Sequence, residues 1–123
     1  MSAKKKILVI DDDEMVFVYL QKKIGYLYDL VTTTKPTLAV NMAVLQEPDL
    51  ILCDIDMPGL SGGELGVRLY ECAYTRLIPF AYLTSYVTPS EVRDLKGNVG
   101  GRPGIAKATP GPEMIEIIEQ MLQ

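Results

Sequence analysis

The chain contains no histidine. A phosphohistidine carrier, a histidine general base and a histidine-ligated metal are therefore excluded within these 123 residues. Cysteine is scarce too. The isolated Cys53 and Cys72 form no metal-binding or redox spacing, so we interpret both as small buried hydrophobic residues. Any chemistry must rest on aspartate, glutamate, threonine, serine, tyrosine or lysine side chains.

A long apolar run and an excess of positive charge are also missing. No stretch approaches the roughly 18 apolar residues of a membrane span. Lys4 to Lys6 precede an apolar run that is too short for a signal peptide, and no cleavage site follows. The net charge of -4 argues against nucleic acid as a direct partner. We therefore expect a cytoplasmic protein that binds neither membrane nor nucleic acid.

The residues that are present indicate one folded unit. Hydrophobic residues make up 48% of the sequence and charges of both signs are interspersed among them, which is typical of a globular domain. A chain of 123 residues has room for one such domain. We expect residues 1–123 to form a single domain, without an output domain after the last helix, either as a single-domain protein or as a domain cut from a longer protein.

Short apolar runs alternate with amphipathic segments along the whole chain. The apolar, β-branched runs predict strands, and the segments with apolar residues at helical spacing predict helices. The predicted strands are residues 5–10, 28–34, 49–54, 80–85 and 104–107, and the predicted helices are residues 15–24, 37–46, 62–74, 90–96 and 112–122. Five such units predict an α/β fold with a parallel sheet, helices on both faces and a binding site beyond the carboxyl ends of the strands. The glycine-rich residues 97–104 are interpreted as a flexible loop.

Polar residues stand at the carboxyl ends of the predicted strands. They are Asp11, Asp12, Asp54, Thr84, Ser85 and Lys107. Each alone is commonly a helix cap or a solvated residue, but their joint placement on one sheet edge argues against that explanation. Clustered carboxylates repel by roughly 4 kcal/mol per pair at 4 Å and an effective dielectric of 20. Oxygen ligands favour Mg²⁺ as the offsetting cation, with Lys107 as a further positive charge. This set predicts a carboxylate that attacks phosphorus and forms an aspartyl phosphate.

The chain resembles the receiver domain of two-component response regulators, the class that includes the chemotaxis receiver. The resemblance is carried by "ILVIDDDE", by "DLILCDIDMPGLSGGE" with the family pattern D-x-x-M-P-x-x-x-G, by "LTS" and by Lys107, and it covers nearly the whole chain. It implies a (βα)5 flavodoxin-like three-layer sandwich with strand order 2-1-3-4-5. It also implies a signalling switch rather than an enzyme, which is phosphorylated by a sensor histidine kinase or a phosphotransfer protein.

The same resemblance implies a role for each matching residue. Asp54 would be the phosphoacceptor, and Asp11 and Asp12 would bind Mg²⁺ together with Asp54, with Asp12 as a direct ligand. The backbone carbonyl of Asp56 would complete the protein ligands. The resemblance further implies that Thr84 hydrogen-bonds the phosphoryl group, that Lys107 forms an ion pair with it, that Gly62 permits a tight turn, and that the Asp56 and Tyr86 side chains tune dephosphorylation.

The last third of the chain departs from the family pattern. Ala108 follows the conserved lysine where receivers usually have proline, often with a cis bond, so this loop must be held in another way. Gly104 stands where the family often has a switching aromatic residue, and the fourth helix is short. We therefore expect phosphorylation to be retained and signal transmission through the fourth and fifth helices to be atypical. A homodimer favoured by phosphorylation is expected of the family, but the altered face weakens that expectation.

Three other functions are compatible with parts of the sequence. A pseudo-receiver would bind partners without being phosphorylated. A Mg²⁺-dependent phosphatase would use "DID" as its D-x-D motif, although that motif normally ends the first strand. A flavin-binding domain would need a phosphate loop where this chain has "DDDE".

Overall fold

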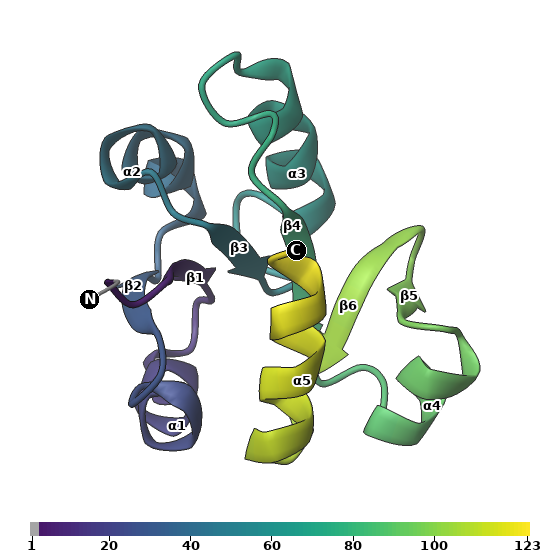
Figure 1. The fold of residues 1–123 in the computed structure, drawn as a ribbon. Coiled ribbons are helices and arrows are strands. Elements are labelled where there is room, and N and C mark those ends of the chain that lie inside the picture. Colours follow the sequence, from purple (N-terminus) through teal and green to yellow (C-terminus); the bar gives the residue numbers. More distant parts are fainter. Residues whose placement is uncertain (1–2) are drawn as a thin grey trace.

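The computed structural model describes residues 3–123, which form a central sheet flanked by helices (Figure 1). The strands are β1 (Lys6–Ile10), β2 (Asp29–Thr33), β3 (Leu50–Cys53), β4 (Phe80–Thr84), β5 (Asn98–Val99) and β6 (Arg102–Ala106). The helices are α1 (Glu14–Ile24), α2 (Ala39–Gln46), α3 (Gly62–Glu71), α4 (Pro89–Asp94) and α5 (Gly111–Met121), and a short 3-10 turn, η1 (Pro36–Leu38), precedes α2. No helix within residues 3–123 has the length and apolar composition needed to cross a membrane.

The strands form one sheet in the order β2-β1-β3-β4-β6-β5. All except β5 run parallel, which confirms the predicted α/β fold and the predicted order of five parallel strands. β5 is an addition that the sequence analysis missed: it pairs antiparallel with β6, and Val99 lies opposite Arg102. Gly100 and Gly101 form the turn between them, both with positive φ, as the favoured two-residue hairpin turns require. The interpretation of this segment as a flexible loop is therefore wrong.

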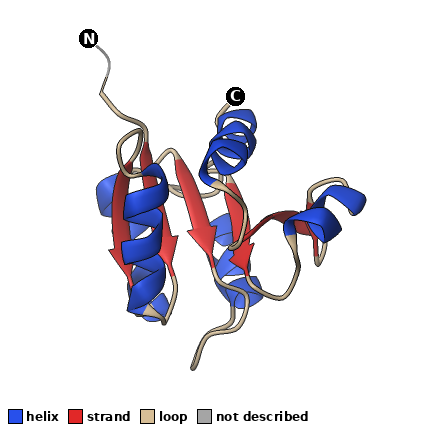
Figure 2. Ribbon diagram, turned by 90° about the horizontal axis from the view of Figure 1, so that it is seen from below, coloured by secondary structure: helices blue, strands red, loops and turns tan. Residues whose placement is uncertain are grey.

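The inner strands are buried on both faces, and their side chains alternate between two cores. Ile7 and Val9 of β1 pack in the core beneath α1 and α5, whereas Leu8 and Ile10 pack in the core beneath α2 and α3. Figure 1 shows these two helix pairs on opposite sides of the sheet, and Figure 2 shows the same layers from below. Full burial of one such side chain contributes roughly 1.5–3 kcal/mol, so packing on both sides stabilises the strands whose ends carry the polar residues.

Helix α3 ends at Glu71, three residues before the predicted end at residue 74. The buried Thr75 side chain donates its hydroxyl to the Leu69 carbonyl at 2.6 Å, which satisfies a carbonyl of the last turn and closes the helix. Cys72 follows directly and is partly exposed, while Cys53 is buried in β3. The expectation of burial is thus confirmed for Cys53 and wrong for Cys72.

Candidate functional site

Three carboxylates meet at the carboxyl ends of β1 and β3. The parallel ladder continues one step past each strand, because the Asp54 amide donates to the Ile10 carbonyl at 2.9 Å and the Asp11 amide donates to the Thr33 carbonyl at 3.2 Å. One carboxylate oxygen from each of Asp11, Asp12 and Asp54 lies within 4.8 Å of the others. The structure therefore brings together the three acidic residues that the sequence placed at this edge.

Asp11 is the buried member of the cluster, with 1% of its surface exposed. Its Oδ1 accepts the Asp13 amide at 3.0 Å, and Asp13 in turn caps α1 by accepting the Met15 amide at 3.0 Å. Asp11 Oδ2 is in ionic contact with Lys107 Nζ at 2.7 Å but accepts no hydrogen bond of regular geometry. A buried carboxylate oxygen with one partner retains the capacity to bind a second cation.

Lys107 joins the cluster from the end of β6. Its amide donates to the Thr84 carbonyl at 2.8 Å, which ties the start of the following loop to β4. Its ammonium lies 2.7 Å from Asp11 Oδ2 and 3.6 Å from Asp54 Oδ1. Burial acts to lower the pKa of Lys107, but the contact with Asp11 and the attraction of Asp54 outweigh it and raise that pKa. Lys107 is therefore a permanent cation at neutral pH.

The Asp54 carboxylate is held in an environment that disfavours its charge. Burial first, and then repulsion by Asp11, raise the pKa of Asp54, with a smaller contribution from Asp12. Lys107 and the Ile55 amide, which donates to Asp54 Oδ1 at 3.0 Å, act against this rise. Three carboxylates face the single ammonium of Lys107 here, so the site attracts a further cation.

Thr84 and Tyr86 bring the β4–α4 loop to the same edge. The Thr84 hydroxyl oxygen is buried and accepts the Tyr86 amide at 3.0 Å, which leaves its hydrogen free to donate to a bound group. The Tyr86 hydroxyl donates to Asp56 Oδ2 at 2.8 Å, and this hydrogen bond raises the pKa of Tyr86. Asp56 and Tyr86 were predicted separately as residues that tune dephosphorylation, and the bond that joins their two loops was not predicted. Ser85 lies exposed between Thr84 and Tyr86.

Gly62 allows α3 to start directly against the backbone of Asp54. A Cβ atom at Gly62 would lie 2.3 Å from the Asp54 carbonyl oxygen, far inside normal contact distance. Glycine is needed at Gly62 for this close approach and not for a left-handed conformation, which in this loop is adopted by Gly59, with φ +85°. Ser61 and Glu64 form a capping box at this helix end, so α3 holds the loop after Asp54 in place.

The three acidic residues have the donor chemistry that a hard divalent cation requires. Their ligand atoms are all oxygens, and Asp11 Oδ2 is contacted by the Lys107 ammonium but accepts no hydrogen bond of regular geometry. The side chain of Asp56 is exposed and hydrogen-bonded to Tyr86, and it lies outside the cluster of Asp11, Asp12 and Asp54. The residues present therefore fit Mg²⁺, and the part of each residue in binding it stays a prediction.

Comparison with known proteins decides the family. The family model described as the response regulator receiver domain matches residues 7–119. The chain belongs to this family. The receiver is 39% identical over 68 residues to the alkaline phosphatase synthesis transcriptional regulatory protein PhoP of Bacillus subtilis, covering 54% of this chain and 28% of PhoP. It is 28% identical over 121 residues to the polar-differentiation response regulator DivK of Brucella ovis, covering 96% of each chain.

Solved structures support the same fold. The receiver domain of the sensor histidine kinase PA1611 from Pseudomonas aeruginosa, described with a magnesium ion coordinated in its active site cleft, aligns with a TM-score of 0.79. The two chains are 22% identical, and the alignment covers 98% of each. The receiver family comprises signalling switches of two-component systems, and the predicted family and fold of this chain are confirmed.

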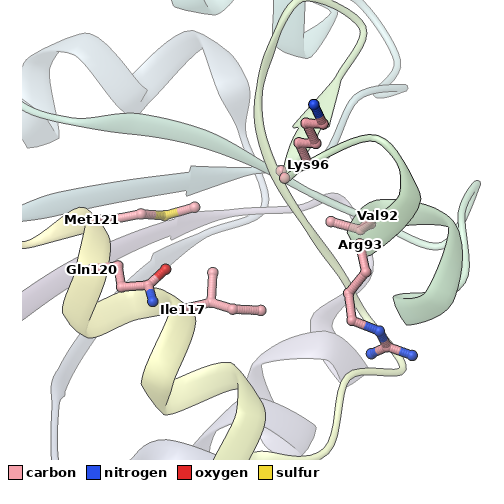
Figure 3. A pocket seen from close by; sticks show the side chains of 8 residues that line it. Val92, Arg93, Lys96, Ile117, Gln120 and Met121 are labelled. Carbon is pink, nitrogen blue, oxygen red and sulfur yellow. The ribbon is translucent and has the colours of Figure 1, made fainter.

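The face formed by α4, β6 and α5 is where the sequence predicted an atypical transmission of the signal. A groove of about 400 Å³ lies between α4 and α5 (Figure 3). Arg93 Nη1 contacts Glu113 Oε1 at 2.6 Å and so joins these two helices. Gly104 lines the groove, and a Cβ atom there would lie 2.6 Å from Cγ2 of Val99. The β5 hairpin thus fills the space into which an aromatic residue at Gly104 would project.

Proposed function

We propose that this receiver accepts a phosphoryl group on Asp54 from the phosphohistidine of a sensor histidine kinase or a phosphotransfer protein, and changes conformation to signal. The observation that carries the proposal is the placement of the Asp54 carboxylate beside Asp11, Asp12 and the Lys107 ammonium. The 123 residues contain no histidine, so the phosphohistidine must come from outside them.

The residues of the site are suited to this transfer. A carboxylate oxygen of Asp54 forms a bond to phosphorus as the bond from phosphorus to the imidazole nitrogen breaks, and no proton has to leave the nucleophile. Lys107 and the Thr84 hydroxyl would then stabilise the charge on the transferred oxygens. Mg²⁺, held by the carboxylates of Asp11, Asp12 and Asp54 and by the backbone carbonyl of Asp56, would neutralise charge on the phosphoryl group.

A groove beside the site supports a protein as phosphodonor. It has a volume of about 430 Å³ and lies between α1 and the loops that follow β4 and β6. Met15 and Tyr19 of α1 line it on one side, and Val87, Lys107 and Ala108 line it on the other. Met15 and Tyr19 are 65% and 45% exposed, so a helix that carries the donor histidine would find apolar surface next to Lys107.

The proposal is tested by measuring intact mass after incubation with acetyl phosphate, with and without Mg²⁺. We expect the mass to increase by one phosphoryl group only when Mg²⁺ and Asp54 are both present. Asp54→Asn should abolish the increase, while Asp94→Asn, at an exposed position on α4, should leave it unchanged. Absence of labelling by both acetyl phosphate and a cognate kinase would favour the pseudo-receiver, and rapid multiple turnover on phosphate monoesters would favour the phosphatase.

A further inference from the structure

The loop between β6 and α5 carries Lys107 into the acidic cluster. Its start is fixed by the bond from the Lys107 amide to the Thr84 carbonyl, and the Thr109 amide donates to the Ala106 carbonyl at 3.0 Å to close a turn. Ala108 stands where receivers usually have proline, so the sequence predicted that this loop is held by another contact. No cis peptide bond occurs within residues 3–123, so the loop is not held in that way either.

Lys23, in the last turn of α1, reaches this loop from the neighbouring helix. Its ammonium donates to the Thr109 carbonyl at 2.5 Å and also to the Tyr19 hydroxyl. The Tyr19 ring faces the same ammonium, with its centroid 4.0 Å from Nζ. The carbonyl of Thr109, two residues after Lys107, is therefore held to α1 by a charge-assisted hydrogen bond.

The first residue of α5 also lies close to Lys23. A Cβ atom at Gly111 would lie 3.2 Å from Lys23 Cγ and 3.4 Å from the Lys23 carbonyl oxygen, so the loop passes Lys23 at close range. Pro110 caps α5 without a side-chain hydrogen bond, and the Thr109 side chain is buried. The loop before α5 and the first residue of α5 therefore lie directly against α1.

We propose that Lys23 is a positioning residue for phosphorylation: by holding the Thr109 carbonyl, it keeps the Lys107 ammonium between Asp11 and Asp54. This inference rests on the function proposed above for Asp54. The Lys107 ammonium lies 2.7 Å from Asp11 Oδ2 but 3.6 Å from Asp54 Oδ1. A small shift of the loop is therefore enough to take it out of reach of Asp54. Release of the loop lets Lys107 remain with Asp11 and withdraw from the phosphoryl group on Asp54.

The test replaces Lys23 by methionine, which fills similar space but donates no hydrogen bond. Lys22→Met is the matched control, because Lys22 lies in the same last turn of α1 and is exposed. Beryllofluoride serves as the phosphoryl mimic. Its affinity at saturating Mg²⁺, the Mg²⁺ affinity alone and the rate of labelling by acetyl phosphate are measured for each protein.

We expect Lys23→Met to weaken beryllofluoride binding and slow labelling by about tenfold to a hundredfold, since small displacements of a catalytic group have effects of this size. The Mg²⁺ affinity should stay within about twofold of the wild-type value, because the loop does not supply the carboxylate ligands of the proposed metal site. Lys23→Arg keeps a cationic donor and should recover most of the lost affinity. Lys22→Met should match the wild type in all three measurements.

Two results would overturn the role of Lys23 alone. One is a Lys23→Met variant that binds beryllofluoride and is labelled like the wild type. The other is a parallel loss of Mg²⁺ affinity, beryllofluoride affinity and thermal stability, which would indicate general destabilisation. A wild-type protein that neither binds beryllofluoride nor is labelled would overturn the proposed function, and with it this inference.

Discussion

Substitution of Gly62 by alanine tests how α3 is fitted against Asp54. The added Cβ would lie 2.3 Å from the Asp54 carbonyl oxygen, whereas ordinary contacts begin near 3.4 Å, so the two backbones must separate by about 1 Å. Neither can move freely. The Gly62 amide donates to the Ile55 carbonyl at 2.8 Å, and the Asp54 amide is bonded to β1.

Overpacking of this kind typically destabilises a protein by about 1–3 kcal/mol, and we expect a value near 3 because both contacting groups are backbone. For a domain of this length, that loss lowers Tm by roughly 10 °C. Gly63→Ala is the control in the same helical turn, where a Cβ atom would meet the Tyr82 hydroxyl at 3.4 Å and Ser61 Oγ at 3.9 Å, both ordinary contacts. Alanine is the better helix former by up to about 1 kcal/mol, so Gly63→Ala should be neutral or stabilising.

The assay is urea unfolding followed by far-UV circular dichroism, with thermal unfolding as a second measurement. The proposed close fit between α3 and Asp54 is refuted if Gly62→Ala lies within about 0.5 kcal/mol of the wild type, or if Gly63→Ala is equally destabilising. A Gly62→Ala protein that folds should also be labelled more slowly by acetyl phosphate, because the Asp54 backbone is displaced.

Two further predictions concern the charges of the site. The raised pKa of Asp54 means that its ionised form is disfavoured in the folded protein, so metal-free Asp54→Asn should melt at a higher temperature than the wild type at pH 7. Because the Asp54 pKa is raised in the folded protein, wild-type stability should fall as pH rises from the ordinary aspartate pKa, about 3.9, to the raised value. Thermal melts of Asp54→Asn across that pH range should lack this fall. A lower melting temperature for Asp54→Asn would contradict the crowding of carboxylates. Lys107→Met leaves the buried Asp11 carboxylate without its cation and should destabilise the metal-free protein by about 3–5 kcal/mol in urea unfolding. Mg²⁺ should recover part of that loss, and a fully stable metal-free Lys107→Met protein would show that Asp11 does not depend on Lys107.

The parallel strands and the edge that carries the site were predictable because each signal is local. β1 and β3 are continuous apolar runs, and an aspartate follows each of them directly. The parallel arrangement then brings Asp11 and Asp54 to one edge without any further information. This is why the acidic cluster could be inferred from residues that are far apart in the sequence.

The features that were missed depend on very short elements or on side-chain geometry. β5 has two residues, too few for a periodic pattern, although the adjacent glycines Gly100 and Gly101 are a hairpin-turn signal that could have indicated it. The bond from Lys23 to Thr109 and the bond from Tyr86 to Asp56 each join distant segments. No spacing in the sequence encodes which side chain reaches which carbonyl or carboxylate.

The β5 hairpin also determines how the sheet ends. An edge strand with free N–H and C=O groups can pair with another chain and seed aggregation. β6 avoids this along its first residues because β5 covers them, and Pro103 has no N–H to offer. Val92 of α4 packs with Ala106 at the other end of β6. Of the two sides of the sheet in residues 3–123, only the β2 side therefore presents a five-residue strand to a second chain, and the hairpin protects the other side from intermolecular strand pairing.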